Sequence, residues 1–376
     1  MTQEQNSLFV GLISGTSMDG IDAGVFRFDD SNRVHCLAGQ TIAYPRDLHS
    51  QLLALRHRET SLSLNELGVL DTTLGRHFAA AALHAIEASG YTPADITAIG
   101  SHGQTVRHDP SADAPYTIQL ADPHVISAQT GCTVIADFRR ADVARGGEGA
   151  PLLPLLHDWL FADRDEPVAV VNLGGIANLT YLPLNGPLLA YDTGPANTLI
   201  DQWLQQRVGE AFDRGGSRAA TGQVQTEWLE AMLADEYFAR VPPKSTGFEH
   251  FNLSWLAAWQ PLTKALTDND IVATLTELSA RSIATAIKKC PQRPAKVWLA
   301  GGGVHNRTLT RALATHLQPA AVAAIGTLGI DADQLEAAGF AWLARERLAG
   351  NATRHCEVTG AREHALLGTI VAGHSS

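Results

Sequence analysis

Hydrophobic and polar positions along the chain follow the strand period in some segments and the helix period in others. Residues Leu8–Phe28 alternate about a polar turn at Gly15–Gly20, which predicts a β-hairpin. Helical spacing then runs from about Leu48 to Ser89, and shorter apolar segments at 96–106 and 132–138 predict further strands with turns. Strands that alternate with helices in this way are typical of an α/β fold.

The second half of the chain repeats the opening pattern. Val168–Tyr181 reads as a strand, a turn at Leu173–Gly175 and a returning strand, and a third strand is expected to end at Asp192. Further on, the strand Val297–Ala300 runs into three consecutive glycines. A single glycine turn could equally well belong to an ordinary hairpin or to a binding site. Three of them in this order favour two similar lobes whose turns bind phosphate through backbone N–H groups.

Chain length supports the division into two lobes. The 376 residues exceed what one hydrophobic core usually supports. A polar stretch at 163–167 predicts the boundary, so we expect an N-terminal lobe over residues 1–165 and a C-terminal lobe over 166–376. The last helix, expected over Asp333–Leu348, is predicted to pack back on the first lobe.

Composition narrows the class of protein. The net charge of -11 argues against nucleic acid as a partner, because phosphate neutralisation needs many Lys and Arg residues. The apolar run Leu8–Ile13 is too short for a secretory leader or a membrane span, so we expect a cytoplasmic protein with no membrane partner. The four cysteines form no CxxC pair and the histidines form no HExxH pair, so neither disulfides nor a histidine metal centre is predicted.

The first turn has the composition of a phosphate-binding loop. Gly15 and Gly20 let the backbone approach anionic oxygens, and Thr16 and Ser17 add hydroxyl donors. The carboxylate of Asp19 can hold hydrated magnesium. No GK[ST] follows, so this is not a Walker A loop, and the GxGxxG pattern of a dinucleotide fold is missing as well.

The string Gly11–Asp22 resembles the opening signature of the anhydro-N-acetylmuramic acid kinase family, which shares its fold with sugar kinases, actin and heat-shock chaperone ATPases. Further stretches resemble family motifs in the same order along essentially the whole chain: Ser101–Thr105, Ala136–Arg140, Gly149–Leu152, Asn172–Asn178, Asp192–Pro195, Pro243–Gly247, Gly301–Gly303 and Gly329–Ala337. Two positions depart from the family pattern, Glu148 where glutamine is usual and Phe248 where arginine is usual.

The resemblance implies a fold, a reaction and two cofactors. The implied fold is α/β, a two-lobed actin-like ATPase (ribonuclease H-like) fold with a central nucleotide cleft. The implied reaction uses ATP and Mg²⁺ to open the 1,6-anhydro ring of 1,6-anhydro-N-acetylmuramic acid and to phosphorylate O6, in cell-wall (peptidoglycan) recycling. A homodimer is also implied. The residues implied in nucleotide binding are Gly15, Thr16, Ser17, Met18, Asp19, Gly20, Ile21, Asp22, Gly174, Gly175, Gly301, Gly302 and Gly303, with Asp19 as the metal residue.

Two acidic residues are the catalytic candidates. Asp192 is expected at a strand end before a Thr-Gly-Pro turn, where its carboxylate can act as a general base. Its alternative role is the N-cap of a helix beginning near Ala196. By resemblance, Glu336 helps to bind the sugar and to orient the attacking water. Alternatively, Glu336 is a solvated acid favoured by the dipole at a helix start.

Three further residues are the remaining substrate-binding candidates, alongside Asp192 and Glu336. Arg139 suits a substrate carboxylate or a polar sugar oxygen, because a guanidinium group makes two directed hydrogen bonds. His102 and Gln104, expected on a turn, offer donors for hydroxyl or N-acetyl groups. A histidine in such a place is often only a structural residue, so His102 is not predicted to be catalytic.

Two alternative functions stay open at this point. One is a kinase for another amino sugar on the same fold, in which Asp192 deprotonates the substrate hydroxyl directly. The other is a nucleotide-gated protein like actin or the chaperone ATPases, in which hydrolysis drives lobe motion. The second is disfavoured, because such a protein should carry a partner-binding extension and the two lobes account for the sequence.

Overall fold

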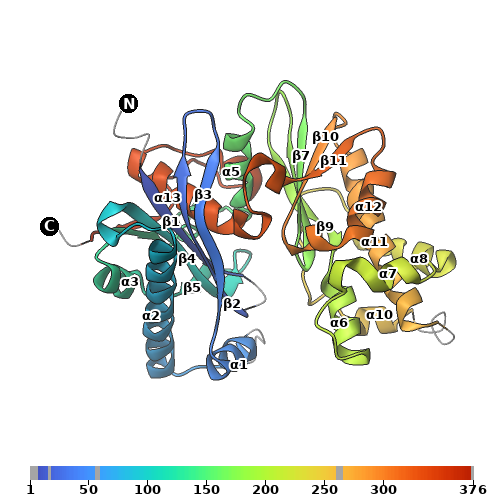
Figure 1. The fold of residues 1–376 in the computed structure, drawn as a ribbon, viewed down its shortest axis with the longest axis horizontal. Helices are drawn as coiled ribbons and strands as arrows, with labels where there is room; N and C mark the ends of the chain where they lie inside the picture. The colour runs from blue at the N-terminus through green and yellow to red at the C-terminus, as the bar shows by residue number, and fades with distance from the viewer. Residues whose placement is uncertain (1–6, 16–17, 56–59, 260–265, 374–376) are drawn as a thin grey trace. The chain divides into compact units, whose positions relative to one another are not determined.

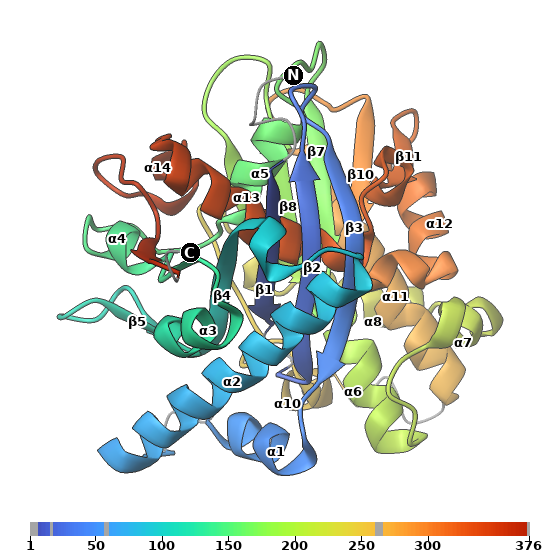
Figure 2. The same ribbon diagram turned by 60° about the vertical axis from the view of Figure 1, so that its left-hand side comes forward.

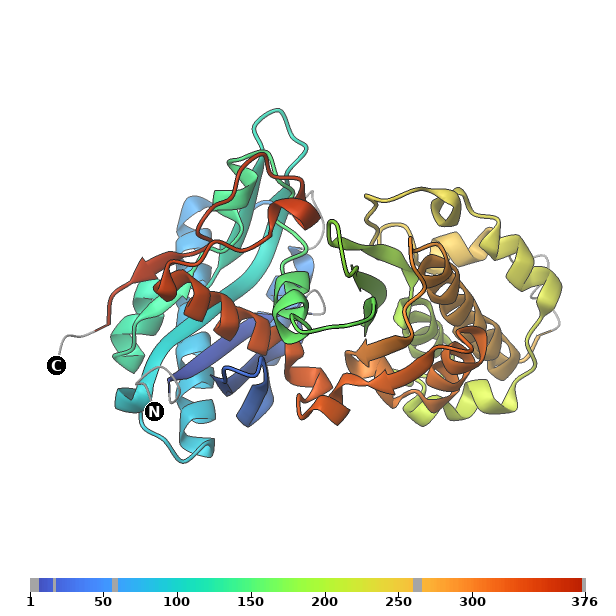
Figure 3. The same ribbon diagram turned by 90° about the horizontal axis from the view of Figure 1, so that it is seen from above.

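The computed structural model describes residues 7–15, 18–55, 60–259 and 266–373, and the chain divides into two compact units (Figure 1). Unit 1 comprises Met1–Ala162 together with Leu328–Ser376, and unit 2 comprises Asp163–Thr327. The C-terminal segment, red in Figure 3, therefore belongs with the blue N-terminal strands rather than with unit 2. Its long helix contacts the first strand of the chain.

Unit 1 is built on one mixed sheet in the order β12-β6-β4-β1-β2-β3, with β5 paired to β4. The strand β1 runs antiparallel to β2 and parallel to β4. The strands are β1 (Leu8–Ser14), β2 (Gly20–Phe28), β3 (Val34–Ala43), β4 (Ile96–Asp109), β5 (Tyr116–Leu120), β6 (Val134–Ala136) and β12 (Thr369–Val371). The helices are α1 (Arg46–Ala54), α2 (Leu64–Ala88), α3 (Pro123–Thr130), α4 (Arg140–Val143), α5 (Leu153–Leu160), α13 (Leu335–Ala349) and α14 (Cys356–Thr359).

Unit 2 has a second mixed sheet, in the order β11-β10-β7-β8-β9. Here β7 runs antiparallel to β8 and parallel to β10. The strands are β7 (Val168–Leu173), β8 (Ile176–Leu182), β9 (Leu189–Pro195), β10 (Lys296–Ala300) and β11 (Ala321–Ala324). The helices are α6 (Thr198–Arg207), α7 (Ser217–Thr221), α8 (Thr226–Leu233), α9 (Glu236–Ala239), α10 (Leu253–Ala257), α11 (Asp268–Lys288) and α12 (Arg307–His316).

The two sheets share one topology. With β5 and β12 of unit 1 set aside, each sheet has three antiparallel strands, followed in chain order by two parallel strands on the other side of the first strand. This order, 3-2-1-4-5, is the ribonuclease H-like arrangement. Its presence in both units confirms the predicted α/β fold class.

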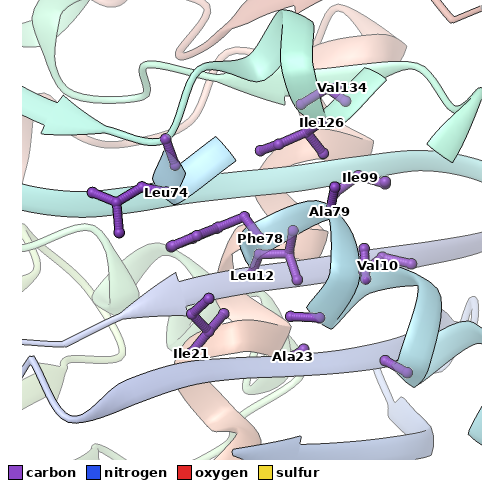
Figure 4. Packing of buried hydrophobic residues seen from close by; sticks show 14 of the residues in the cluster. Val10, Leu12, Ile21, Ala23, Leu74, Phe78, Ala79, Ile99, Ile126 and Val134 are labelled. Carbon is purple, nitrogen blue, oxygen red and sulfur yellow. The ribbon is translucent and has the colours of Figure 1, made fainter. Parts of the chain in front are cut away.

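The core of unit 1 forms where the alternating faces of β1 meet two helices. Val10 and Leu12 face α2 and pack with Leu74 and Phe78 of that helix (Figure 4). Because successive side chains of a strand point to opposite faces, Gly11 faces the other side, where α13 lies. Figure 2 shows α2 running across β1 and β2. The sheet is thus covered by a helix on each face.

Several predicted boundaries differ from the structure. The helical stretch predicted from Leu48 to Ser89 is two helices, because a capping box at Ser63 and Glu66 starts α2 independently. The strand β3 was not predicted, since its residues are mostly half-exposed and their apolar alternation is weak. Among the described residues, none of the helices combines the length and apolar composition that a bilayer crossing requires.

Candidate active site

The first glycine turn joins β1 to β2 in unit 1 and is held by a side chain from β4. The Ser14 hydroxyl donates to Oε1 of Gln104 at 2.6 Å, and Nε2 of Gln104 donates to the carbonyl oxygen of Gly15 at 3.3 Å. Gln104 is buried within the long strand β4, whereas a turn was predicted there. Its amide therefore contacts both Ser14 and Gly15, and the predicted contact of Gln104 with a sugar stays a prediction.

Two described residues of this segment, Met18 and Ile21, offer backbone groups rather than side chains. Met18 has a φ of 57°, and its side chain and that of Ile21 are buried in the core of unit 1. Only their backbone groups are therefore suited to bind a phosphate. The predicted residues Thr16 and Ser17 lie outside the described residues.

Three carboxylates of unit 1 interact beside this turn. Burial raises the pKa of Asp22, and the charges of Asp19 and Asp333 add to the rise, although a hydrogen bond from Thr41 at 2.5 Å lowers it. Asp19 and Asp333 are exposed. A divalent cation would offset this repulsion, and carboxylate oxygens are ligands that Mg²⁺ accepts. The donor set therefore fits the predicted metal residue Asp19.

A second group in unit 1 is centred on Arg139. Its Nε donates to Nε2 of His102 at 2.9 Å, and its Nη1 donates to the carbonyl oxygen of Gly149 at 2.7 Å. Burial lowers the pKa of Arg139 to about 10, while the negative charges of Glu336 and Asp142 oppose that fall. Arg139 and Glu336, both predicted as substrate residues, are thus brought together within one unit.

His102 is a buried, neutral partner of that arginine. Burial and the charge of Arg139 lower its pKa well below the ordinary value. A neutral ring has one donor and one acceptor, and Nδ1 lies 3.0 Å from the Gly103 carbonyl oxygen while Nε2 accepts from Arg139. Both nitrogens are therefore used within the protein, and His102 orients Arg139.

The helix that carries Glu336 is placed by two glycines of the sheet. A Cβ on Gly11 would lie 1.8 Å from the carbonyl oxygen of Ala337, and one on Gly100 would lie 2.0 Å from that of Phe340. Only glycine at these positions lets α13 approach β1 and β4 so closely. Phe340 also packs against the ring of His102, with ring centroids 4.6 Å apart.

In unit 2 the half-buried carboxylate of Asp192 is fixed through both oxygens. Asn178 donates its amide N–H to Oδ1, and the backbone N–H of Thr246 donates to Oδ2 at 2.9 Å. The Tyr237 hydroxyl also donates to the backbone carbonyl oxygen of Asp192 at 2.7 Å. Asp192 lies inside β9, not at its end as predicted, because the strand continues to Pro195 after a bulge opposite Asn178.

The other two glycine motifs meet in unit 2. A Cβ on Gly301 would lie 2.2 Å from Oδ1 of Asn172, and one on Gly303 would lie 2.6 Å from Leu173, next to the turn Gly174–Gly175. Gly302 faces open space. The carbonyl oxygens of the Gly174–Gly175 turn accept backbone N–H groups of residues 196–198 at the start of α6. The two turns therefore form one backbone surface at the ends of β7 and β10.

Some residues of these groups were given no role from the sequence. Asn178 lies in the motif Asn172–Asn178 and pairs with Asp192 across the hairpin, so the strand register alone could have identified it. Thr246 lies in another motif, but 54 residues separate it from Asp192 and no local pattern reports the contact. The two positions that depart from the family pattern, Glu148 and Phe248, are both exposed.

Comparisons with known proteins agree with the motifs. The family model described as "Anhydro-N-acetylmuramic acid kinase" matches residues 7–373. A protein of that name from Xylella fastidiosa is 46% identical over 365 residues, 96% of each chain. One from Coxiella burnetii is 42% identical over 368 residues, 97% of each chain.

Similarities to solved structures are much weaker. A ROK family glucokinase from Streptomyces griseus in complex with glucose and AMPPNP is 16% identical, with 90% of this chain and 100% of that chain covered and a TM-score of 0.41. The activator of the 2-hydroxyisocaproyl-CoA dehydratase from Clostridium difficile is 14% identical, with 91% and 96% covered and a TM-score of 0.42. Both are too distant for their ligands or activities to be transferred.

Proposed function

Because the chain belongs to the anhydro-N-acetylmuramic acid kinase family, we propose that it opens the 1,6-anhydro ring of 1,6-anhydro-N-acetylmuramic acid with water and phosphorylates O6 from ATP. The products are N-acetylmuramic acid 6-phosphate and ADP. The bond from C1 to the bridging oxygen breaks as water adds to C1. The released O6 forms the new bond to the γ-phosphorus, and ADP leaves.

Asp192 is proposed as the general base for that water. The observation that supports this role is the fixed orientation of its carboxylate, because Asn178 donates to one oxygen and the backbone N–H of Thr246 donates to the other. An ionised carboxylate only accepts hydrogen bonds, which suits it to take a proton from water. A base held in this way loses little orientational freedom as the proton moves.

The group around Arg139 is proposed to bind the sugar. N-acetylmuramic acid carries a carboxylate, which a guanidinium group binds through two directed hydrogen bonds. Arg139 is half-buried and is oriented by His102 and by Gly149. Glu336, whose charge acts on Arg139, is proposed to accept hydrogen bonds from sugar hydroxyl groups and from the attacking water.

The glycine turns are proposed to bind ATP. Backbone groups of Gly15 and Gly20 in unit 1 and of Gly174 and Gly175 in unit 2 are assigned to phosphate oxygens, and Gly301–Gly303 to the adenosine. Asp19 is proposed to hold hydrated Mg²⁺, which supplies positive charge to the transferred phosphoryl group when bound. A homodimer is proposed from the family resemblance, and sedimentation velocity tests it; the cytoplasmic location expected from the sequence stays a proposal.

The substitution Asp192→Asn tests the role of the base. It keeps the size and one oxygen of the side chain but removes the proton acceptor, so ADP release with the anhydro sugar should fall on the order of a thousandfold while the Kd for ATP stays unchanged. The exposed Asp163→Asn, with the same change of charge in the same unit, is the matched control. Turnover within about threefold of the unsubstituted enzyme would exclude Asp192 as the base.

A further inference from the structure

Asp142 is a buried carboxylate of unit 1 whose negative charge acts on Arg139. It is fully buried and accepts hydrogen bonds from Nδ1 of His355 at 2.5 Å, from the hydroxyl of Thr359 at 2.6 Å and from the backbone N–H of Gly149 at 2.7 Å. Burial alone would raise its pKa, but these hydrogen bonds together lower it. The carboxylate is thus kept charged in the interior by three donors.

Two of the three donors come from a distant part of the chain. His355 is the N-cap of α14 and Thr359 is its last residue, and both lie more than 200 residues after Asp142, whereas Gly149 lies seven residues after it. The loop between Asp142 and Gly149 is shaped around the carboxylate. A Cβ on Gly147 would lie 2.2 Å from Oδ2 of Asp142, and Gly149 has a φ of 67°. The C-terminal segment therefore contacts this loop through the Asp142 carboxylate, and also through the Glu148 N–H, which donates to the Thr359 carbonyl oxygen at 2.8 Å.

Gly149 connects the carboxylate to the proposed sugar site. Its N–H donates to Asp142, and its carbonyl oxygen accepts from Nη1 of Arg139 at 2.7 Å. Arg139 in turn donates to His102. Hydrogen bonds therefore link His355 to Asp142, Asp142 to Gly149 and Gly149 to Arg139 without a break.

Metal binding is a competing explanation for this region. His355, Cys356 and His364 place potential ligand atoms within 4.8 Å of one another. However, Nε2 of His355 accepts the backbone N–H of Ala365 at 2.8 Å, and its Nδ1 donates to Asp142. Both nitrogens of this neutral ring are therefore occupied, and a metal ion would have to displace the Ala365 hydrogen bond.

We propose that Asp142, held by His355 and Thr359, is a positioning residue that fixes Gly149 and thereby aims the guanidinium group of Arg139 at the substrate carboxylate. This inference rests on the proposed function, because it takes Arg139 as a sugar-binding residue. It adds three residues to the site that do not touch the substrate. It also gives the C-terminal segment a part in substrate affinity.

A matched pair of substitutions at Thr359 tests the link. Thr359→Val keeps the shape of the side chain and removes its hydroxyl donor, and Thr359→Ser keeps the donor. We expect Thr359→Val to raise the KM for the anhydro sugar about tenfold, with kcat and the KM for ATP unchanged, because only substrate affinity depends on Arg139. Thr359→Ser should stay within about twofold of the unsubstituted enzyme.

Combination with Arg139→Ala separates positioning from general stability. If Asp142 acts through Arg139, adding Thr359→Val to Arg139→Ala should change the KM for the sugar by less than about twofold, while the fall in Tm is the same in both backgrounds. An equal rise in KM in both backgrounds, or an equal rise in the KM for ATP, would overturn the proposal. With Mg²⁺ in excess, sensitivity of the KM for the sugar to added Zn²⁺ or to a Zn²⁺-selective chelator would overturn the proposal in favour of the metal explanation.

Amide hydrogen exchange gives a readout that needs no turnover. The Gly149 N–H should exchange at least about tenfold faster in Thr359→Val than in Thr359→Ser, because its acceptor is less firmly held. Unchanged exchange at Gly149 would overturn the positioning network even in an inactive protein. An unsubstituted enzyme that neither binds nor phosphorylates the anhydro sugar would instead refute the proposed function.

Discussion

The close packing of α13 on the unit-1 sheet predicts a large effect for Gly11→Ala. The added Cβ would lie 1.8 Å from the carbonyl oxygen of Ala337, which is short of an ordinary contact of 3.4 Å by about 1.6 Å. The obstacle is helix backbone and not a flexible side chain, so α13 as a whole has to shift. Overpacking of a core typically costs 1–3 kcal/mol, and we expect about 3 kcal/mol or more here.

The same shift should reach the active site. Glu336 immediately precedes Ala337, so its carboxylate moves with the helix away from Arg139. The kcat/KM for the anhydro sugar should therefore fall at least about tenfold even in buffer where the variant is fully folded. Urea unfolding followed by tryptophan fluorescence measures the stability, and coupled ADP release measures the activity.

Gly68→Ala is the matched control for the glycine substitution. Gly68 lies in α2 and has nothing within 4 Å of the position of a Cβ, so alanine should stabilise the helix by about 0.5–1 kcal/mol without affecting activity. If Gly11→Ala unfolds at the same urea concentration as the unsubstituted protein, the close approach of α13 to β1 is wrong. Lost stability with unchanged kcat/KM would instead show that the position of Glu336 does not matter.

Two further predictions concern charge. Asp19→Ala should raise the Mg²⁺ concentration needed for half-maximal turnover at least about tenfold, because it removes one carboxylate of the proposed metal site. An unchanged dependence of turnover on Mg²⁺ would refute the metal role of Asp19. His157 is buried, and burial lowers its pKa to about 3, so the unfolded chain takes up a proton below about pH 6.5 that the folded protein does not. The free energy of unfolding should therefore fall by up to about 1.4 kcal/mol for each unit of decreasing pH between these values. His157→Gln should remove this contribution to the pH dependence, whereas the control His124→Gln, at an exposed position, should leave it in place. An unchanged pH dependence in His157→Gln would contradict this prediction.

Local patterns in the sequence predicted those parts of the fold that depend on neighbouring residues. Apolar periodicity and glycine positions predicted the hairpin Leu8–Phe28 with its turn, the hairpin Val168–Tyr181 and the helix near Glu336. The break between α1 and α2 also has a local signal, because Ser63 and Glu66 form a capping box. That signal was outweighed by the helical spacing on both sides of it.

Contacts between distant segments could not be predicted in the same way. His102 and Gln104 were expected on a turn, but pairing with β1 extends β4 through them and turns their side chains to internal partners. Likewise, Asp192 was expected at a strand end, and pairing with β8 continues the strand beyond it. In each case, hydrogen bonding across the sheet decides where the strand ends, and the local sequence does not record the partner.

Isotope labelling tests the central claim, that water adds to C1 while O6 receives the phosphoryl group. The enzyme, ATP and 1,6-anhydro-N-acetylmuramic acid are incubated briefly in H₂¹⁸O, with unlabelled product incubated alongside to measure exchange at the anomeric hydroxyl. We predict one ¹⁸O at C1 of the 6-phosphate product and none in its phosphoryl group, above the exchange control. Label in the phosphoryl group, or a phosphorylated product that keeps the 1,6-anhydro ring, would contradict the mechanism.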